Sequence, residues 1–61
     1  MEHVGQGIVW ELRDGKLIIE IDVTAEGVPS ASGKTMVVAT TRGNVPIAGG
    51  RLGLNFYRYK V

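Results

Sequence analysis

The sequence predicts an all-β domain: a four-stranded antiparallel sheet that curls into a small, partly open barrel or is completed by a second subunit. Three observations lead to this fold class. Two alternating apolar runs flank Asp14-Gly15, a third run is apolar on both of its faces, and nine glycines interrupt a chain of 61 residues. A chain of this length forms a single domain, here residues 1–61.

The clearest element is a hairpin formed by Ile8 to Leu12 and Leu17 to Val23. An Asp-Gly pair between two alternating runs favours a two-residue turn with positive φ at both central residues. Such a turn fixes the strand register, so that the numbers of paired residues sum to 29. The apolar pairs on one face are then Ile8 with Ile21, Trp10 with Ile19, and Leu12 with Leu17. Trp10 is therefore expected to lie in the core.

Lys34 to Thr41 is predicted to be the central strand of the sheet. Met36 points to one face of the strand and Val37 to the other, and further apolar residues follow, so both faces of the run are apolar. A strand that is buried on both faces has this continuous pattern, whereas a half-buried strand alternates. The preceding segment, Ala25 to Gly33, is rich in turn-forming residues and is expected to be a loop.

The remaining segments are assigned by the same rules. Residues 1–6 are expected to form an arm without defined structure. Arg42 to Gly50 is expected to be a long connection, because Pro46 cannot donate a hydrogen bond to a strand ladder. Val45 and Ile47 would pack against an open end of the core. The last strand is predicted to run from Arg51 to about Lys60.

Size and composition predict a self-associating protein without a metal or a cofactor. A 61-residue chain buries only about 60% of its unfolded surface, so small domains often need disulfides, a metal or a partner subunit. The sequence contains no cysteine, and its single histidine, His3, lies near a terminus. A homo-oligomer is the supplement that remains. We find neither a signal peptide nor an apolar run of membrane-spanning length, which favours a cytoplasmic protein with no membrane partner.

Charge is distributed unevenly along the chain. Residues 1–30 contain six acids and two bases, a net charge of −4, whereas residues 31–61 contain five bases and no acid. Such asymmetry can mark a nucleic-acid surface. The alternative is that acidic and basic strands neutralise each other across the sheet or between subunits.

Two patterns that resemble catalytic sites are better explained as structure. Ser32-Gly33-Lys34-Thr35 resembles part of a phosphate-binding loop, but Val28 stands where the first glycine is required and a strand follows in place of a helix. A plain turn, or one phosphate contact by Lys34 and neighbouring amides, is expected there. Glu20 and Asp22 share a strand face that is expected to be solvated. Enzyme activity is therefore not expected.

The C-terminal run from Asn55 to Lys60 interleaves aromatic rings with basic residues. This pattern is typical of small β-folds that bind single strands, because rings stack on bases while cations neutralise phosphates. The sequence therefore favours a non-enzymatic binding module for single-stranded DNA or RNA with low sequence specificity. The alternative is a self-associating structural or adaptor protein whose tyrosines contact a partner subunit. The candidate binding residues are Lys34, Arg42, Arg51, Tyr57, Arg58, Tyr59 and Lys60.

Two motifs in the C-terminal half resemble a known group of proteins. Pro29 to Asn44 reads Pro-Ser-x-Ser-Gly-Lys-Thr-x-Val-Val-Ala-Thr-Thr-x-Gly-Asn, and Gly53 to Tyr57 reads Gly-Leu-Asn-x-Tyr. Together they resemble a family of very short, uncharacterised prokaryotic and phage β-proteins. The resemblance implies no activity.

Overall fold

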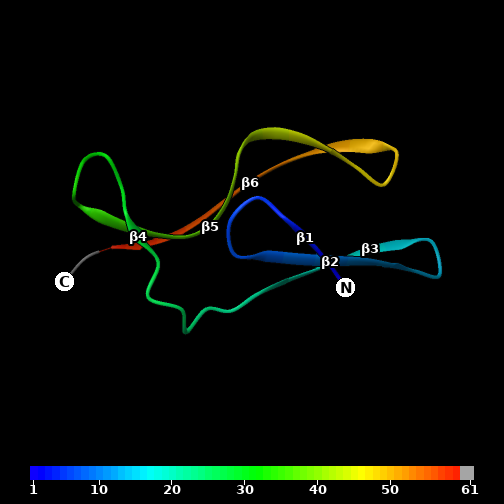
Figure 1. The fold of residues 1–61 in the computed structure, drawn as a ribbon, viewed down its shortest axis with the longest axis horizontal. Coiled ribbons are helices and arrows are strands. Elements are labelled where there is room, and N and C mark those ends of the chain that lie inside the picture. The colour runs from blue at the N-terminus through cyan, green and yellow to red at the C-terminus, as the bar shows by residue number, and fades with distance from the viewer. Residues whose placement is uncertain (60–61) are drawn as a thin grey trace.

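The computed structural model describes residues 1–59, which form strands and turns with no helix, so the all-β fold class is confirmed (Figure 1). No segment of this described range is a helix long and apolar enough to cross a membrane. The strands are β1 (Glu2–Val4), β2 (Ile8–Arg13), β3 (Lys16–Ile21), β4 (Val28–Pro29), β5 (Thr35–Ile47) and β6 (Gly50–Tyr59).

The first sheet has the strand order β1-β2-β3 and contains the predicted hairpin. Asp14 and Gly15 form its turn with φ angles of 52° and 75°, and the observed register pairs Leu12 with Leu17 and Ile8 with Ile21, as predicted. The expectation that residues 1–6 lack structure was wrong. β1 pairs antiparallel with β2 from Glu2 to Val4, and a three-residue strand with two polar residues is too short for its alternation to be recognised in the sequence.

The second sheet has the order β4-β5-β6, so the strand predicted to be central does lie between two others. Val38 and Ala39 are adjacent in β5 and both are buried, at a register shift between Val37 and Ala39. The expected loop from Ala25 to Gly33 contains a short strand, β4, which pairs Val28 with Val37.

The expectation that Arg42 to Gly50 forms a long connection was wrong. β5 continues through this segment to Ile47, and a two-residue turn at Ala48-Gly49 leads into β6. Ile47 and Gly50 flank this turn and form its hydrogen-bonded pair, so the next pair, Pro46 with Arg51, exchanges no backbone hydrogen bonds. The nitrogen of Pro46 therefore faces away from β6, and the proline interrupts nothing. Ile47 is buried, as expected.

A bulge bends β5 between Thr40 and Asn44. Arg42 and Gly43 have positive φ there, which leaves backbone groups of β6 without ladder partners. The buried hydroxyl of Thr41 replaces these partners: the Leu54 N–H donates to Thr41 Oγ1 at 2.9 Å, and the same hydroxyl donates to the carbonyl of Gly43. The bend is therefore compatible with a satisfied hydrogen-bond ladder.

The two sheets are joined where the β1–β2 loop crosses β5. The Gln6 N–H donates to the Thr40 carbonyl at 2.8 Å, and the Thr40 N–H donates to the Gln6 carbonyl at 2.9 Å. Glycines on both sides of Gln6 permit this approach, because a Cβ would lie 2.3 Å from the Thr40 oxygen at Gly5 and 2.4 Å from the Val38 oxygen at Gly7. Both glycines also have positive φ, which other residues rarely adopt.

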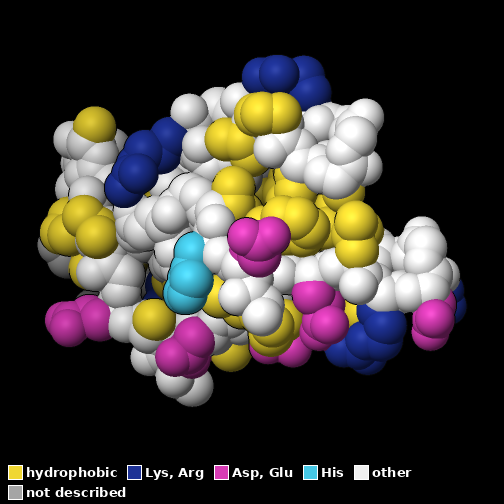
Figure 2. Space-filling view, turned by 45° about the vertical axis from the view of Figure 1, so that its right-hand side comes forward, with side chains coloured by type: hydrophobic (Ala, Val, Ile, Leu, Met, Phe, Trp, Pro, Cys, Tyr) yellow, Lys and Arg dark blue, Asp and Glu magenta, His cyan; other side chains and the backbone are white. Residues whose placement is uncertain are grey.

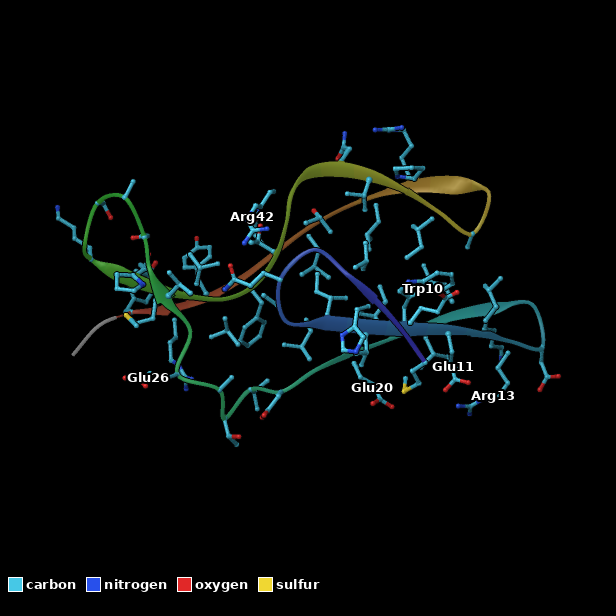
Figure 3. The ribbon with its side chains drawn as sticks, in the orientation of Figure 1. Trp10, Glu11, Arg13, Glu20, Glu26 and Arg42 are labelled. Carbon is cyan, nitrogen blue, oxygen red and sulfur yellow. The ribbon has the colours of Figure 1, made fainter. Side chains whose placement is uncertain are left out.

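The result is a pair of three-stranded sheets, not one four-stranded sheet, and the described strands do not close into a barrel. Figure 1 shows the β5–β6 turn above β2 and β3, whereas β4 and the adjoining ends of β5 and β6 extend beyond the first sheet. Trp10 points from β2 into the space between the layers and is half-buried (Figure 3). The molecule is flat, with extents of 40 × 21 × 13 Å. A four-strand prediction failed because it did not recognise β1 and β4.

The crossing predicts unequal costs for two glycine substitutions with nearly the same φ. Gly33 has φ of 75° and no atom within 4 Å of the position that a Cβ would occupy, whereas Gly7 has φ of 73° and faces the Val38 oxygen. Gly33→Ala should cost about 1–2 kcal/mol because of its left-handed backbone. Gly7→Ala should cost about 1–3 kcal/mol more, because the two backbones must separate. Urea unfolding of both variants measures the difference, and equal losses would contradict the proposed crossing.

Candidate functional site

Two exposed tyrosines lie on one face at the end of β6. Tyr57 pairs with Val37 and Tyr59 pairs with Thr35 in β5, so alternation along the strand places both rings on the same side of the sheet. Their side chains are 53% and 75% exposed. The ring centroids are 6.3 Å apart with an interplanar angle of 80°, an edge-to-face arrangement. The sequence predicted this shared face, and the structure leaves it uncovered by the described part of the chain.

An apolar row extends the tyrosine face across the second sheet. Val28 in β4, Val37 in β5 and Tyr57 in β6 are directly opposite one another and therefore share a face. Val28 is 52% exposed, so the row ends at an open edge. Sequence analysis missed Val28 because β4 has only two residues and includes Pro29. The feature of the sequence that could have identified Val28 is its spacing from the turn that precedes β5, which places it opposite Val37 in a hairpin. Val28, Val37, Tyr57 and Tyr59 are called the tyrosine face below.

Lys34 is the last residue of the β4–β5 turn, directly before β5 begins at Thr35. The turn is held by the Ser30 N–H, which donates to the Thr35 carbonyl at 2.9 Å, and by the Thr35 hydroxyl, which donates to Ser30 Oγ at 2.8 Å. The Gly33 N–H donates to the Ser30 carbonyl at 3.0 Å, so this amide is engaged within the turn. These bonds agree with a plain turn in place of a phosphate-binding loop. Lys34 itself is exposed.

The remaining candidate cations do not gather at the tyrosine face. Arg58 pairs with Met36, so it lies on the opposite face of β6, where its guanidinium donates to the carbonyl of Ala25. Arg51 is at the other end of β6 and donates to the Asn44 carbonyl at 3.1 Å. Lys60 lies outside the described residues. Of the seven candidates, the structure therefore brings together only the two tyrosines.

Arg42 occupies an intermediate position. It follows Thr40 at the bulge of β5, and its guanidinium donates to Gln6 Oε1 at 3.1 Å, although the side chain is exposed. In Figure 3, Arg42 lies on one side of the β5–β6 ribbon and Glu26 on the other. Arg42 is thus a cation that lies partway along β5 between the tyrosine face and the β5–β6 turn.

No ion pair joins the two sheets within residues 1–59, but the charge of Arg58 in β6 adds to the hydrogen bonds from Thr24 in lowering the pKa of Asp22. Within residues 1–59, one ion pair is present: Arg13 contacts Glu11 at 2.6 Å, and both belong to β2. Figure 2 shows basic side chains at the top and upper left of the molecule, with acidic side chains along its lower half beside a second basic group. The basic half of the sequence therefore retains cations that are available to a ligand or to another subunit.

The carboxylates of the first sheet lie beside a shallow pocket of about 350 Å³, whose lining includes His3, Glu20 and Asp22. Asp22 is occupied locally: it accepts hydrogen bonds from the Thr24 N–H at 2.9 Å and from the Thr24 hydroxyl at 2.6 Å. The hydroxyl bond is the main reason that the pKa of Asp22 lies below its ordinary value of 3.8. No cluster of three metal-ligating residues occurs in the described range. Asp22 therefore serves a local turn.

Comparisons with known proteins yield no relative for this chain: no family model matches it, and no curated protein or solved structure is significantly similar. The candidate function therefore rests on the geometry described above.

The bond between Thr24 and Asp22 predicts a change in the acid titration of Asp22. Thr24→Val removes the hydroxyl donor and keeps the backbone donor, so the pKa of Asp22 should rise toward 3.8. Because the folded-state pKa is lowered, the bond stabilises the fold above about pH 4 and this contribution is lost as the pH falls through the folded-state pKa. Carboxyl NMR titration measures the shift. Thr35→Val is the remote control, and an Asp22 pKa that is equal in both variants would contradict this cause.

Proposed function

We propose that the chain is a non-enzymatic binding module of the cytoplasm that binds single-stranded DNA or RNA on its tyrosine face with low sequence specificity. The observation that carries the proposal is the exposure of Tyr57 and Tyr59 on one face, 53% and 75%. The proposal requires no metal or cofactor, because stacking and charge neutralisation supply the binding energy.

Stacking is the chemistry that this face offers. A tyrosine ring presents an apolar π surface to any base, and each base that stacks contributes about 1–3 kcal/mol. Tyr57 and Tyr59 are two residues apart on one strand, so successive bases of an extended strand can contact them in turn. Every base has a π surface, which explains why binding of this kind tolerates different sequences.

Two exposed cations, one in the β4–β5 turn and one in β5, set the expected salt dependence. Lys34 adjoins Thr35, the partner of Tyr59, and Arg42 lies farther along the same strand. If each neutralises one phosphate, log K should fall with log salt at a slope of about −1.4, since a single strand contributes about −0.7 per phosphate. This shallow slope describes a weak binder. Arg51 and Arg58 contribute little in this arrangement, because one is distant and the other is on the opposite face.

Tyrosine substitutions test the stacking. Tyr59→Ala or Tyr57→Ala should weaken binding of a fluorescent single-stranded oligonucleotide by about 1–3 kcal/mol, whereas Tyr59→Phe should retain most of the affinity because it keeps the ring. Fluorescence anisotropy at low salt measures the affinity. Lys16→Ala, an exposed base in β3 of the first sheet, is the distant control and should change little.

Melting temperature and oligomeric state must match the wild type before any loss is attributed to stacking. If the wild-type protein binds neither single-stranded DNA nor RNA at low salt, this proposed function is wrong. If Tyr59→Ala and Tyr59→Phe lose the same affinity, the ring is not the binding element.

A second candidate function, a self-associating structural or adaptor protein, is favoured by a separate observation. The chain exposes 4429 Å², whereas a folded monomer of this mass exposes about 3,900 Å². Its radius of gyration of 12.5 Å also exceeds the roughly 10.5 Å expected for 61 residues. The described apolar core consists of Ile8, Val38, Ala39 and Ile47. We therefore include a homo-oligomer in the proposal, with acidic and basic surfaces that can meet between subunits.

Self-association predicts a melting temperature that depends on protein concentration. Mass action favours the assembled state as concentration rises, so a hundredfold increase should raise the melting midpoint by several degrees. Calorimetry or circular dichroism over this range measures the change, and lysozyme measured alongside should show none. A constant midpoint together with a monomeric mass in light scattering would exclude the homo-oligomer.

A further inference from the structure

One edge of β6 has no partner in the described chain. The Leu54 N–H points to β5, where it donates to Thr41 Oγ1, and backbone groups of successive residues in a strand point to opposite edges. The odd-numbered residues of β6 therefore direct their N–H and C=O groups away from β5. No hydrogen bond within residues 1–59 engages these groups. They are the backbone groups of Arg51, Gly53, Asn55 and Tyr57.

The other sheet edges are short or carry features that discourage pairing. β1 has three residues, and β4 has two, one of which is Pro29. β3 has six residues and carries Lys16 and Glu20. By contrast, β6 is the longest of these edges, with ten residues and no proline; its charged residues, Arg51 and Arg58, lie toward its two ends, and the extra residues at both register shifts lie in β5. Long edges of this kind are templates for another strand, and proteins normally protect them.

We propose that a second copy of this chain pairs antiparallel along the free edge of β6, with a two-fold axis at Asn55. The inference rests on the self-association proposed above and does not depend on nucleic-acid binding. The two β4-β5-β6 sheets then form one continuous six-stranded sheet. A two-fold axis perpendicular to the sheet keeps the tyrosine faces of both copies on the same side of this six-stranded sheet.

The side chains of β6 favour the register centred on Asn55. In this register the numbers of paired residues sum to 110, and outward-pointing backbone groups oppose each other. Tyr57 covers Gly53 of the other copy, which supplies the packing that a glycine lacks. Arg51 faces Tyr59, a cation–π pair. Moving the two-fold axis by one residue, to Leu54 or Phe56, shifts the register by two residues and loses either the aromatic cover of Gly53 or the pairing of Arg51 with a tyrosine. On the other face, Phe56 meets Leu54 and Arg58 meets Leu52, so no like charges oppose each other.

The exposed area agrees with a small interface. The accessible area of the chain exceeds that of a typical monomer of the same mass by about 500 Å². If each of two copies buried this excess area in the dimer, the interface would bury about 1,000 Å² in total. An interface of this size is at the lower limit for a specific complex. The pairing should therefore be a reversible dimer that forms with increasing concentration.

Single cysteines test this pairing directly, because the natural chain contains none. In an antiparallel hydrogen-bonded pair the Cα atoms are about 5.5 Å apart, within the range of a disulfide. Asn55→Cys should form a covalent dimer under mild oxidation at least tenfold faster than Ser32→Cys, which is in the exposed β4–β5 turn. Leu54→Cys and Phe56→Cys mark the two shifted registers and should also be slow.

A second measurement leaves Asn55 in place, because its side chain accepts a hydrogen bond from Thr40. Arg51→Cys mixed with Tyr59→Cys should form heterodimers in preference to either homodimer. Sedimentation equilibrium of the wild type separates the outcomes. A dimer with equal cross-linking rates at Asn55→Cys and Ser32→Cys would overturn the β6 pairing and leave self-association standing. A monomer at all concentrations would overturn both. Efficient cross-linking without oligonucleotide binding would overturn only the nucleic-acid proposal.

Discussion

The structure depends on the close contact between the Gly5-Gln6-Gly7 loop and β5. Two backbone hydrogen bonds at Gln6 and Thr40 join the sheets, and the Gln6 side chain adds a third to the Val37 carbonyl at 3.2 Å. A side chain at either glycine would meet a β5 carbonyl oxygen. Beyond this crossing the first sheet covers only part of β5 and β6. The position of the loop therefore determines which part of the second sheet is core and which part is exposed.

The predictable part of the fold is where local chemistry decides the backbone. Asp14-Gly15 between alternating runs specified both the turn and the register of β2 and β3, because few other pairs accept positive φ at adjacent positions. The continuation of β5 could not be recognised in the same way. Pro46 normally marks the end of a strand, and it is tolerated here only because the Ala48-Gly49 turn directs its nitrogen away from β6. That turn has a non-glycine residue at positive φ, which the sequence does not signal.

The candidate site shows the same division. Alternation within β6 was enough to predict that Tyr57 and Tyr59 share a face. The placement of the cations depends on tertiary structure: the bulge turns Arg42 toward Gln6, and Arg58 reaches a carbonyl in the segment that precedes β4. The charge count of a segment therefore does not give the charge of a surface. The cations of the basic half that the structure describes lie on both faces and at both ends of one sheet.

The uncovered end of the second sheet has two kinds of exposed surface, and they accept different partners. The tyrosine face presents side chains, so it can bind a ligand by stacking while the strand edge stays free. The β6 edge presents backbone groups, which only another strand can satisfy fully. Both arise from one cause, because a first sheet of short strands joined to β5 near Thr40 cannot extend to Tyr57 and Tyr59. The two surfaces meet along β6, so pairing at the edge also brings side chains of the other copy beside the tyrosines. A dimer through β6 would therefore place the tyrosine faces of both copies on one side of a continuous sheet, with Arg51 of each copy beside Tyr59 of the other.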